Sequence, residues 1–282
     1  MKTWQQRATA LADELVTQGK LTSPEWIAAV RSVPRHVLVP HYYDYDRTAS
    51  KWVSVDSAHD DLEKVYSNTG LYTKIGSSNS VTPLSSTSTP GLMARMLEML
   101  NIREGHRVLE VGTGTGYNAA LLAHRLGAAN VFSVDIDAEL VALARERLAS
   151  LGYYPTLAAV DGANGMPKHA PFDRIIATCA VPAVPWPWVE QVTDGGLILV
   201  DIKRGIAAGN LILLHRHGHY AEGRFDARWA NFMTIRRPQD QQPGQRPDRN
   251  RDSVTPRPTP ISEPPWEQPT WWFLASLTVS RR

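Results

Sequence analysis

The amino-acid sequence predicts an α/β protein with a doubly wound parallel sheet. Short apolar runs alternate with helical patterns from residue 107 onward, and this alternation is typical of parallel sheets that are covered by helices. Three glycines, Gly112, Gly114 and Gly116, follow the first of these runs and precede a helix. Glycines at such a turn permit tight backbone geometry and the close approach of a ligand. The chain of 282 residues is long enough for one or two domains.

The N-terminal residues 1–90 are expected to form a helical cap and a long loop on the substrate side of the molecule. Residues 3–18 alternate polar and apolar side chains at helical spacing. Ser23 is a typical N-cap residue and is followed by proline, which predicts a short helix through Val30. Residues 41–90 contain many Ser, Thr, Asp and Tyr but few aliphatic runs. A polar segment of this length inside a globular chain indicates a functional loop.

Residues 91–235 are expected to form the domain that contains the sheet. The predicted helices of this domain are residues 91–100, 117–126 and 138–151. The predicted parallel strands are residues 107–111, 130–135, 156–160, 173–178 and 196–202. Beyond them, residues 210–216 and 225–235 are predicted to form antiparallel strands joined around Gly218 and Gly223.

The C-terminal part of the chain has a different composition. Residues 236–270 are rich in proline and charge and almost free of aliphatic side chains, which predicts a flexible, partly polyproline-II linker. Residues 271–282 begin with Trp271, Trp272 and Phe273. Because a free tail rarely exposes such large apolar side chains, we expect this segment to form a strand that docks onto the body.

The composition argues against several classes of partner. Lys and Arg number 30 against 28 Asp and Glu, and this net charge of +2 is too balanced to indicate a nucleic-acid partner. No run approaches 18 apolar residues, so no membrane span is expected. The first residues lack the apolar stretch of a secretory signal. Cys179 is the single cysteine, and no Cys/His cluster has metal-ligand spacing. We therefore expect a cytoplasmic protein without a metal site.

The glycine-rich turn carries the strongest functional signal. It lies within Val108-Leu-Glu-Val-Gly-Thr-Gly-Thr-Gly-Tyr117, between a strand and a helix whose N-terminus favours negative charge such as a ligand carboxylate. Asp135 ends the next strand, where a carboxylate can accept hydrogen bonds from a ribose diol. A turn that binds nothing would not require Glu110 before the glycines and an acid at this spacing.

A nicotinamide dinucleotide is the alternative ligand. The segment from Gly114 to Ala119 formally matches the dinucleotide fingerprint, and Asp135 follows at a compatible distance. Two features argue against it. The motif begins after more than 100 residues instead of opening its domain, and a second pair, Asp161-Gly162, ends the third strand, which fits contact with an adenine edge.

Several motifs in a fixed order make the chain similar to a known family. Residues 107–200 resemble the class I S-adenosylmethionine methyltransferases and, within them, the protein-L-isoaspartate O-methyltransferase family. The resemblance covers roughly residues 24–235. Its motifs are Val33-Pro-Arg-His-Val-Leu-Val39, Ser88-Thr-Pro90, Met93-Ala-Arg-Met96, the glycine-rich turn, Asp161-Gly162, Ala170-Pro-Phe-Asp-Arg-Ile-Ile-Ala177 and Gly195-Gly-Leu-Ile-Leu-Val200. The glycine motif alone is common to many methyltransferases, whereas the upstream motifs make the resemblance specific.

The resemblance implies a Rossmann-like methyltransferase sheet, here with an N-terminal helical cap and a C-terminal Pro-rich extension. It implies S-adenosyl-L-methionine as the cofactor and S-adenosyl-L-homocysteine as its product. The implied cofactor-binding residues are Gly112, Gly114 and Gly116 for the methionine part, Asp135 for the ribose, Asp161 and Gly162 for the adenine, and also Glu110, Thr113 and Ile136. Ser88 matches the active-site serine of the family, and the candidate substrate contacts are Ser86, Thr87, Thr89 and Trp186.

The sequence differs from the family pattern between Ile75 and Pro90, where a longer Ser/Thr-rich stretch replaces a compact Gly-x-Gly-Gln-Thr-Ile-Ser-Gln-Pro segment. We therefore expect methylation of an aspartyl carboxylate in a macrocyclic, ribosomally made peptide, leading onward to aspartimide or isoaspartate. One alternative is repair of isoaspartyl residues in proteins, and another is a non-catalytic cofactor-binding module that recognises a partner. Because a carboxyl group with a pKa of about 3.9 is already ionised at neutral pH, its methylation requires no general base.

Overall fold

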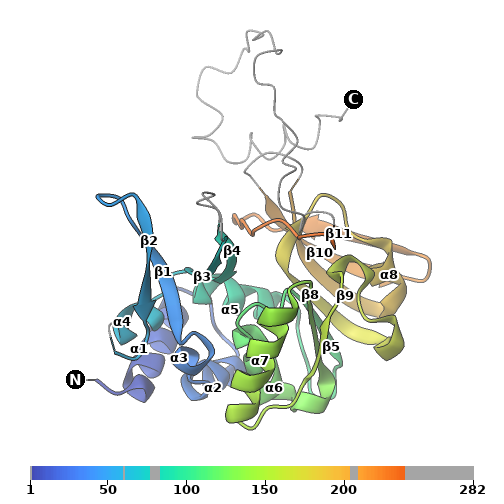
Figure 1. Cartoon of the computed structure of the whole chain (residues 1–282). Helices are drawn as coiled ribbons and strands as arrows, with labels where there is room; N and C mark the ends of the chain where they lie inside the picture. Colours follow the sequence, from blue (N-terminus) through green and yellow to red (C-terminus); the bar gives the residue numbers. More distant parts are fainter. Residues whose placement is uncertain (1, 60, 77–82, 204–208, 239–282) are drawn as a thin grey trace, which may run out of the picture.

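Two β-sheets and the helices around them form the structure, a computed structural model that describes residues 2–59, 61–76, 83–203 and 209–238 (Figure 1). A four-stranded sheet from the N-terminal part of the chain stands beside a seven-stranded sheet from the C-terminal part. The predicted linker beyond residue 238 and the predicted docking strand 271–282 lie outside the described residues. Within the described part of the chain, no helix has the length and apolar character needed to cross a membrane.

The N-terminal helices begin where the sequence predicts. Helix α1 (Trp4–Thr17) starts with a capping box between Thr3 and Gln6. Ser23 accepts a hydrogen bond from the backbone N–H of Trp26 and so caps α2 (Pro24–Ser32), and Trp26 is buried. The short helix α3 (Arg35–Leu38) follows directly.

The prediction of one long polar loop over residues 41–90 is wrong, because four strands within this segment form a sheet. Its strands are β1 (His41–Asp46), β2 (Lys51–Asp56), β3 (Leu71–Ile75) and β4 (Pro83–Thr87), with helix α4 (Leu62–Val65) between β2 and β3. All neighbours are antiparallel, in the order β2-β1-β3-β4. Tyr42 and Leu71 point inward and pack with Val65 in a small core of their own. The alternation uses aromatic side chains instead of aliphatic ones, so it resembles a polar loop in sequence.

The larger sheet confirms the predicted doubly wound architecture. Its parallel strands are β5 (Val108–Val111), β6 (Val131–Asp135), β7 (Thr156–Ala159), β8 (Phe172–Val181) and β9 (Val192–Ile202). The antiparallel strands β10 (Asn210–His217) and β11 (Tyr220–Phe225) complete the order β11-β10-β9-β8-β5-β6-β7. The chain runs outward from β5 to β7 and then crosses to β8. The switch in direction therefore lies at β5, where open α/β sheets bind ligands.

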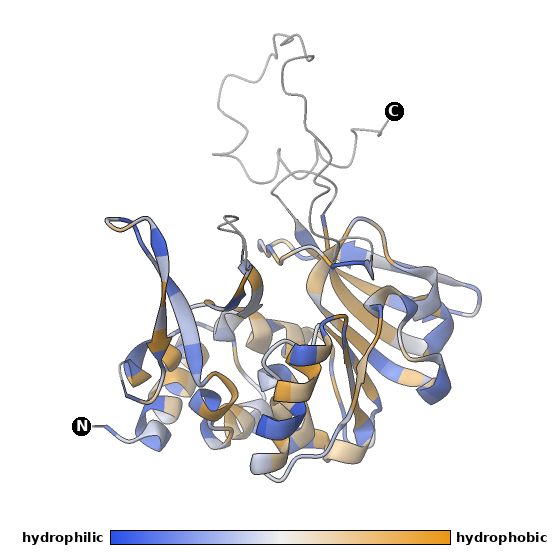
Figure 2. Ribbon diagram, in the orientation of Figure 1, coloured by the Kyte–Doolittle hydropathy of each residue, from blue (hydrophilic) through white to orange (hydrophobic). Residues whose placement is uncertain are grey.

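Helices cover both faces of this sheet. The helices are α5 (Pro90–Met99), α6 (Tyr117–Leu126), α7 (Ala138–Ser150) and α8 (Trp186–Gln191), with the 3-10 helices η1 (Ala128–Asn130), η2 (Gly162–Asn164) and η3 (Pro167–His169). Successive strand residues point to opposite faces, so Val108 joins the core under the N-terminal helices while Leu109 joins the core that contains Trp188. Figure 2 shows the resulting apolar strands between more polar outer helix faces.

The second antiparallel strand was predicted at residues 225–235, but β11 spans Tyr220–Phe225. His217 pairs with Tyr220 across a tight turn at Gly218, whose φ of +57° favours glycine. The chain beyond β11 is instead a crossing segment, residues 229–236, which runs back beside the end of β8. Ala180 donates its N–H to the Met233 carbonyl and accepts from the Ile235 N–H, both at 2.8 Å.

Candidate functional site

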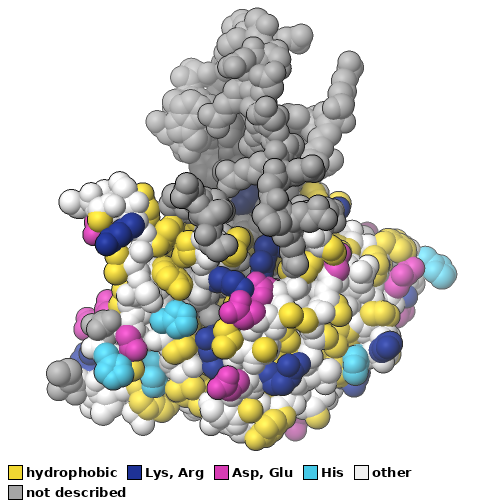
Figure 3. Space-filling model, in the orientation of Figure 1, with side chains coloured by type: hydrophobic (Ala, Val, Ile, Leu, Met, Phe, Trp, Pro, Cys, Tyr) yellow, Lys and Arg dark blue, Asp and Glu magenta, His cyan; other side chains and the backbone are white. Residues whose placement is uncertain are grey.

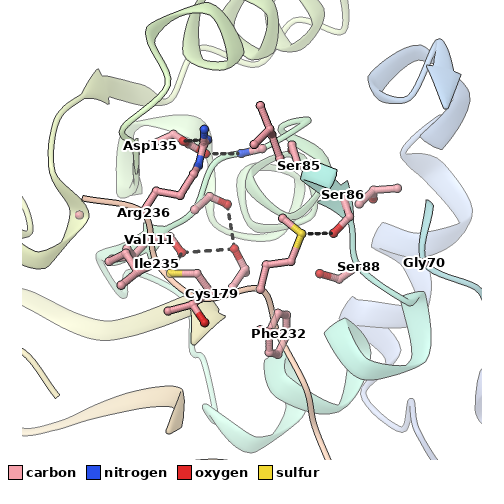
Figure 4. A pocket seen from close by; sticks show the side chains of 18 of the residues that line it. Gly70, Ser85, Ser86, Ser88, Val111, Asp135, Cys179, Phe232, Ile235 and Arg236 are labelled. Atoms are coloured by element: carbon pink, nitrogen blue, oxygen red, sulfur yellow. Dashed lines mark hydrogen bonds and ion pairs between the residues drawn. The ribbon is translucent and has the colours of Figure 1, made fainter. Parts of the chain in front are cut away.

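A cavity of about 430 Å³ lies at the switch point of the large sheet, between β4, the ends of β5 and β6, and the crossing segment (Figure 4). The structure brings most of the predicted site residues to it. Those that line it are Ser86, Thr87, Ser88, Thr89, Gly112, Gly114, Asp135, Ile136 and Gly162. A smaller adjoining cavity is lined by Glu110 and Thr113 and again by Ser86 to Ser88.

The glycine-rich turn forms the floor of the cavity. Gly112 has φ +105°, and a Cβ there would lie 2.5 Å from the Thr178 hydroxyl oxygen, so only glycine fits. Gly114 donates its N–H to Asp135 Oδ2 at 3.0 Å, which ties the turn to the next strand. Gly116 differs from the prediction and does not line the cavity. A Cβ on Gly116 would lie 3.3 Å from Ala144 and Leu148, so this glycine allows α6 to approach α7.

Asp135 presents a nearly buried carboxylate at the cavity. Its side chain is 11% exposed, and its Oδ1 accepts the N–H of Asp137 at 3.1 Å. The guanidinium of Arg236, from the crossing segment, lies 3.5 Å from the same oxygen and 3.4 Å from Asp137 Oδ2. Asp135 therefore remains an acceptor at the cavity wall, and Arg236 lies over it from the opposite side.

Of the two residues predicted to contact adenine, Asp161 and Gly162, only Gly162 lines the cavity. Gly162 lines the cavity, and a Cβ there would lie 2.6 Å from Val111 and 3.6 Å from Ile235, so the wall is narrow at this point. Asp161 is not among the lining residues. Its carboxylate accepts the N–H of Ala163 at 2.9 Å and caps η2, because a carboxylate beside a helix start takes the nearest free backbone donors.

Glu110 is completely buried next to the cavity and belongs to a chain of hydrogen bonds. It accepts from Asn118 at 2.8 Å and from the Ser133 hydroxyl at 2.6 Å, and Ser133 in turn contacts the Thr113 hydroxyl at 2.7 Å. Burial raises the pKa of Glu110 to about 7, although these hydrogen bonds oppose the shift. The Asn118 Oδ1 is buried and has no partner among the described residues, so it remains available to a ligand donor.

We expect the raised pKa of Glu110 to make stability pH-dependent. A buried acid with a raised pKa stabilises the fold fully below its unfolded pKa of about 4.5, and this contribution is lost as the pH rises through about 7. The loss is about 3 kcal/mol across that window. Glu110→Gln should remove it, since a glutamine amide can accept from Asn118 and donate to Ser133. Urea unfolding of both proteins at pH 4.5 and pH 8 measures the difference, and parallel pH profiles would contradict the assignment.

Ser88 stands where β4 leads into α5, and its side chain points into the cavity (Figure 4). Its half-buried position leaves the hydroxyl accessible. The N-cap residue of α5 is Thr89, so capping of this helix does not explain Ser88. The neighbouring Ser86 hydroxyl lies 3.9 Å from the Met233 sulfur, which links β4 to the crossing segment.

Arg35 holds the segment that carries Ser88 in place. The sequence identified Arg35 only as part of the motif at residues 33–39. This side chain is fully buried and donates to the carbonyl oxygens of Val65, Ser67, Thr69 and Ser88 at 2.6–3.3 Å. Burial lowers the pKa of Arg35 to about 10, so it stays charged at neutral pH. No carboxylate forms an ion pair with it among the described residues. Backbone carbonyl dipoles, together with the Tyr117 ring, whose centroid lies 5.4 Å from the guanidinium carbon, therefore compensate this charge.

Trp186 does not line the cavity, against the prediction that it contacts substrate. It is 54% exposed on α8, where its indole N–H donates to Glu190 at 3.0 Å. The second tryptophan of that motif, Trp188, is buried and donates to the Gly162 carbonyl at 2.8 Å. Because residues two apart on a helix of about 3.6 residues per turn lie on nearly opposite sides, one indole points to solvent and the other to the core beneath Gly162.

The crossing segment is the part of the cavity that sequence reasoning missed. The Phe232 N–H donates to Asp201 Oδ2 and the Lys203 ammonium donates to the Phe232 carbonyl, at 2.8 and 3.0 Å, so the end of β9 anchors it. Residues Asn231 to Arg236 all line the cavity. The alternation of apolar side chains there resembles a strand, and only the position of the preceding hairpin excludes that interpretation.

Comparisons with known proteins place this site in context. The profile of the protein-L-isoaspartate(D-aspartate) O-methyltransferase family matches residues 6–222. A protein-L-isoaspartate O-methyltransferase of Aeropyrum pernix is 33% identical over 195 residues, 68% of this chain and 65% of the relative. A second such enzyme, from a Polaromonas species, is 33% identical over 212 residues, 74% of this chain and 87% of the relative. A solved protein-L-isoaspartate O-methyltransferase has a TM-score of 0.68 at 26% identity, over 80% of this chain and 65% of that one.

Proposed function

Because the chain belongs to the protein-L-isoaspartate(D-aspartate) O-methyltransferase family, we propose that it methylates a carboxylate of an isoaspartyl residue in a protein or peptide, with S-adenosyl-L-methionine as the methyl donor. The observation that carries this proposal is that Ser88, which follows β4 of the small sheet, and Asp135, which ends β6 of the large sheet, line one cavity at the switch point. The Asp135 carboxylate can accept hydrogen bonds from a ribose diol, and the Ser88 hydroxyl can donate one to an incoming carboxylate.

The residues present fit the cofactor. A Cβ at Gly112 would clash with Thr178, so only glycine fits where the backbone lines the cavity, and Asn118 Oδ1 is a buried acceptor without a partner among the described residues. Gly112 and Gly114 would hold the methionine part, Asp135 the ribose, and Gly162 with Ile136 the adenine. Glu110 and Thr113 would support the positively charged end through their hydrogen-bond chain. When bound, the cofactor supplies an electrophilic methyl group.

The chain contributes orientation and exclusion of water to the reaction. An isoaspartyl carboxylate is an anion at neutral pH, so no protein base has to remove a proton from it. Ser88 donates its hydroxyl hydrogen to one carboxylate oxygen and holds the other toward the cavity. Cys179, on the wall, stays a neutral thiol because burial raises its pKa, so it does not compete as a nucleophile.

Ser88→Ala is expected to lower turnover at least tenfold, about 1.4 kcal/mol of barrier, while affinity for S-adenosyl-L-homocysteine stays constant. The methyl group transferred to a linear isoaspartyl peptide measures turnover, and calorimetry measures the affinity. Thermal unfolding serves as the control for folding. Unchanged turnover in a stable variant would remove Ser88 from the mechanism.

Two alternatives remain distinguishable by the same assay. The family match and the relatives support repair of isoaspartyl residues better than tailoring of a ribosomally made peptide. Tailoring is favoured by one observation: strands β1 and β2 form a hairpin that projects from the small sheet (Figure 1), and the neighbouring strand β3 contributes Tyr72 to the cavity wall. Efficient methylation of short linear isoaspartyl peptides supports repair, whereas methylation of aspartyl residues in cyclised peptides alone supports tailoring. Binding of S-adenosyl-L-homocysteine without turnover of either substrate would leave a non-catalytic module.

A further inference from the structure

One face of the small sheet carries a row of aromatic side chains that ends at the cavity. The register pairs Trp52 with Tyr45, Tyr43 with Tyr72, and Tyr72 with Ser86. Residues directly opposite in an antiparallel sheet share a face, as do residues two apart on a strand. All five side chains therefore lie on one face, which we call the aromatic face.

The rings on this face contact one another edge to face. The Trp52 ring centroid lies 5.2 Å from that of Tyr45 and 5.3 Å from that of Tyr72. Tyr45 is 40% exposed and Tyr72 is 43% exposed. The opposite face of the same sheet buries Tyr42 and Leu71 against the small core. Figure 3 shows hydrophobic side chains gathered along the hairpin and beside it.

The aromatic face is continuous with the cavity. Tyr72 and Ser86 line the cavity wall, and strand β4 carries the chain from Ser86 to Ser88. Two lysines near the row form ion pairs with groups outside it. Lys74 forms ion pairs with Asp137 and Glu139, and Lys64 with Asp44. A ligand that enters the cavity therefore meets aromatic rings before it meets charges on this side.

We propose that the aromatic face binds the substrate chain itself: an extended peptide segment, next to the methylated residue, whose apolar or aromatic side chains pack on the rings. This inference rests on the proposed function, because the cavity has to hold the reacting carboxylate. Aromatic side chains with polar edges supply large contact area at a small entropic cost, and they are enriched where proteins bind peptides. Continuity with the cavity, through Tyr72, identifies the occupant as the substrate.

The geometry sets the length of the peptide. Ser86 and Trp52 are on strands three positions apart in the order β2-β1-β3-β4, about 14 Å at roughly 4.8 Å per strand. Trp52 pairs with Tyr45, which lies two residues along β1 from Tyr43. Tyr43 pairs with Tyr72 and Tyr72 with Ser86, so the separation of Trp52 from Ser86 is about 16 Å. An extended chain spans about 3.3 Å per residue, so about five residues reach from Ser86 to Trp52. Shorter peptides bind without this contact.

The test compares Trp52→Ala with Val53→Ala. Val53 is the matched control, because it is the next residue on β2, is 39% exposed and points to the opposite face. The substrates are a short linear isoaspartyl peptide and two versions of it, extended by five residues containing Leu and Phe on the N-terminal or the C-terminal side. For Trp52→Ala we expect at least a tenfold higher KM for one extended peptide. The KM of the short peptide, kcat and the affinity for S-adenosyl-L-homocysteine stay unchanged, and Trp52→Phe restores the wild-type KM.

Fluorescence anisotropy of the labelled extended peptides, with S-adenosyl-L-homocysteine present, separates this inference from the proposed function. Weaker binding to Trp52→Ala than to Val53→Ala supports the aromatic face even if neither peptide is methylated, a result that would contradict only the proposed function. Equal affinities of the two variants, or no gain in affinity on extending the peptide on either side, would overturn the inference while methylation of the short peptide leaves the proposed function standing.

Discussion

Replacing Arg35 by methionine is expected to destabilise the protein by about 3–5 kcal/mol, the largest effect of any single change considered for this chain. The substitution keeps much of the apolar stem but leaves four carbonyl oxygens around the buried guanidinium without a donor. One of them belongs to Ser88, so the segment that carries this serine should loosen as well. The stability of Arg35→Lys should lie between those of the wild type and Arg35→Met, because an ammonium offers three donors from a single atom.

Urea unfolding measures the loss, and Arg31→Met is the matched control. Arg31 lies on α2 in an ion pair with Asp13, and both side chains are about half exposed. Surface pairs of this kind contribute roughly 0–1 kcal/mol. Similar losses for the two variants would show that burial and carbonyl contacts at Arg35 do not matter energetically. Turnover of folded Arg35→Lys separates the effect on the Ser88 loop from the effect on global stability.

Asp135→Ala is expected to raise the dissociation constant for S-adenosyl-L-homocysteine at least a hundredfold. Two charge-assisted hydrogen bonds to a ribose diol contribute about 1.5–3 kcal/mol each, and about 2.7 kcal/mol corresponds to a hundredfold change. Some stability should also be lost, because the carboxylate accepts the backbone N–H groups of Gly114 and Asp137. Asp135→Asn retains one acceptor oxygen and should have an intermediate affinity.

Calorimetric titration of the folded variants is the measurement for Asp135. Its control is Arg236→Ala, which removes the cation beside the carboxylate and leaves both backbone hydrogen bonds to it intact. This control should bind the ligand within a few-fold of the wild type or more tightly. A dissociation constant for Asp135→Ala within threefold of the wild-type value would exclude a ribose contact at this carboxylate.

The large sheet could be predicted from sequence because its strands contain continuous aliphatic runs, such as residues 197–200, buried on both faces. The small sheet could not. It buries only one face, and its strands mix aromatic and aliphatic residues with serine, aspartate and lysine, as in Lys51–Asp56. A pattern of this kind is shared by polar loops, and the pairing that distinguishes a sheet depends on contacts between distant segments.

The placement of a residue at the cavity could be predicted where it follows from the residue's position at the end of a strand. Asp135 and Gly112 are of this kind, since parallel strands deliver their carboxyl ends to one edge. Gly116 and Asp161 have the same apparent pattern but different local roles, helix packing and capping, which depend on neighbours such as Ala144 and Ala163. Arg236 reaches the site only because a segment after the last hairpin crosses the sheet, and no local pattern encodes that path.

The crossing segment gives the downstream polypeptide a mechanical connection to the cavity. The family match ends at residue 222, whereas the wall formed by Asn231 to Arg236 lies beyond it. A fragment cut at the end of the match would end within β11 and lose this wall, together with the hydrogen bonds of Ala180 to Met233 and Ile235. Conversely, tension applied to the chain beyond residue 238 would act first on Arg236 and on its contact with Asp135. A partner that pulls on the chain beyond residue 238 would therefore act on the wall of the cavity through this segment of backbone.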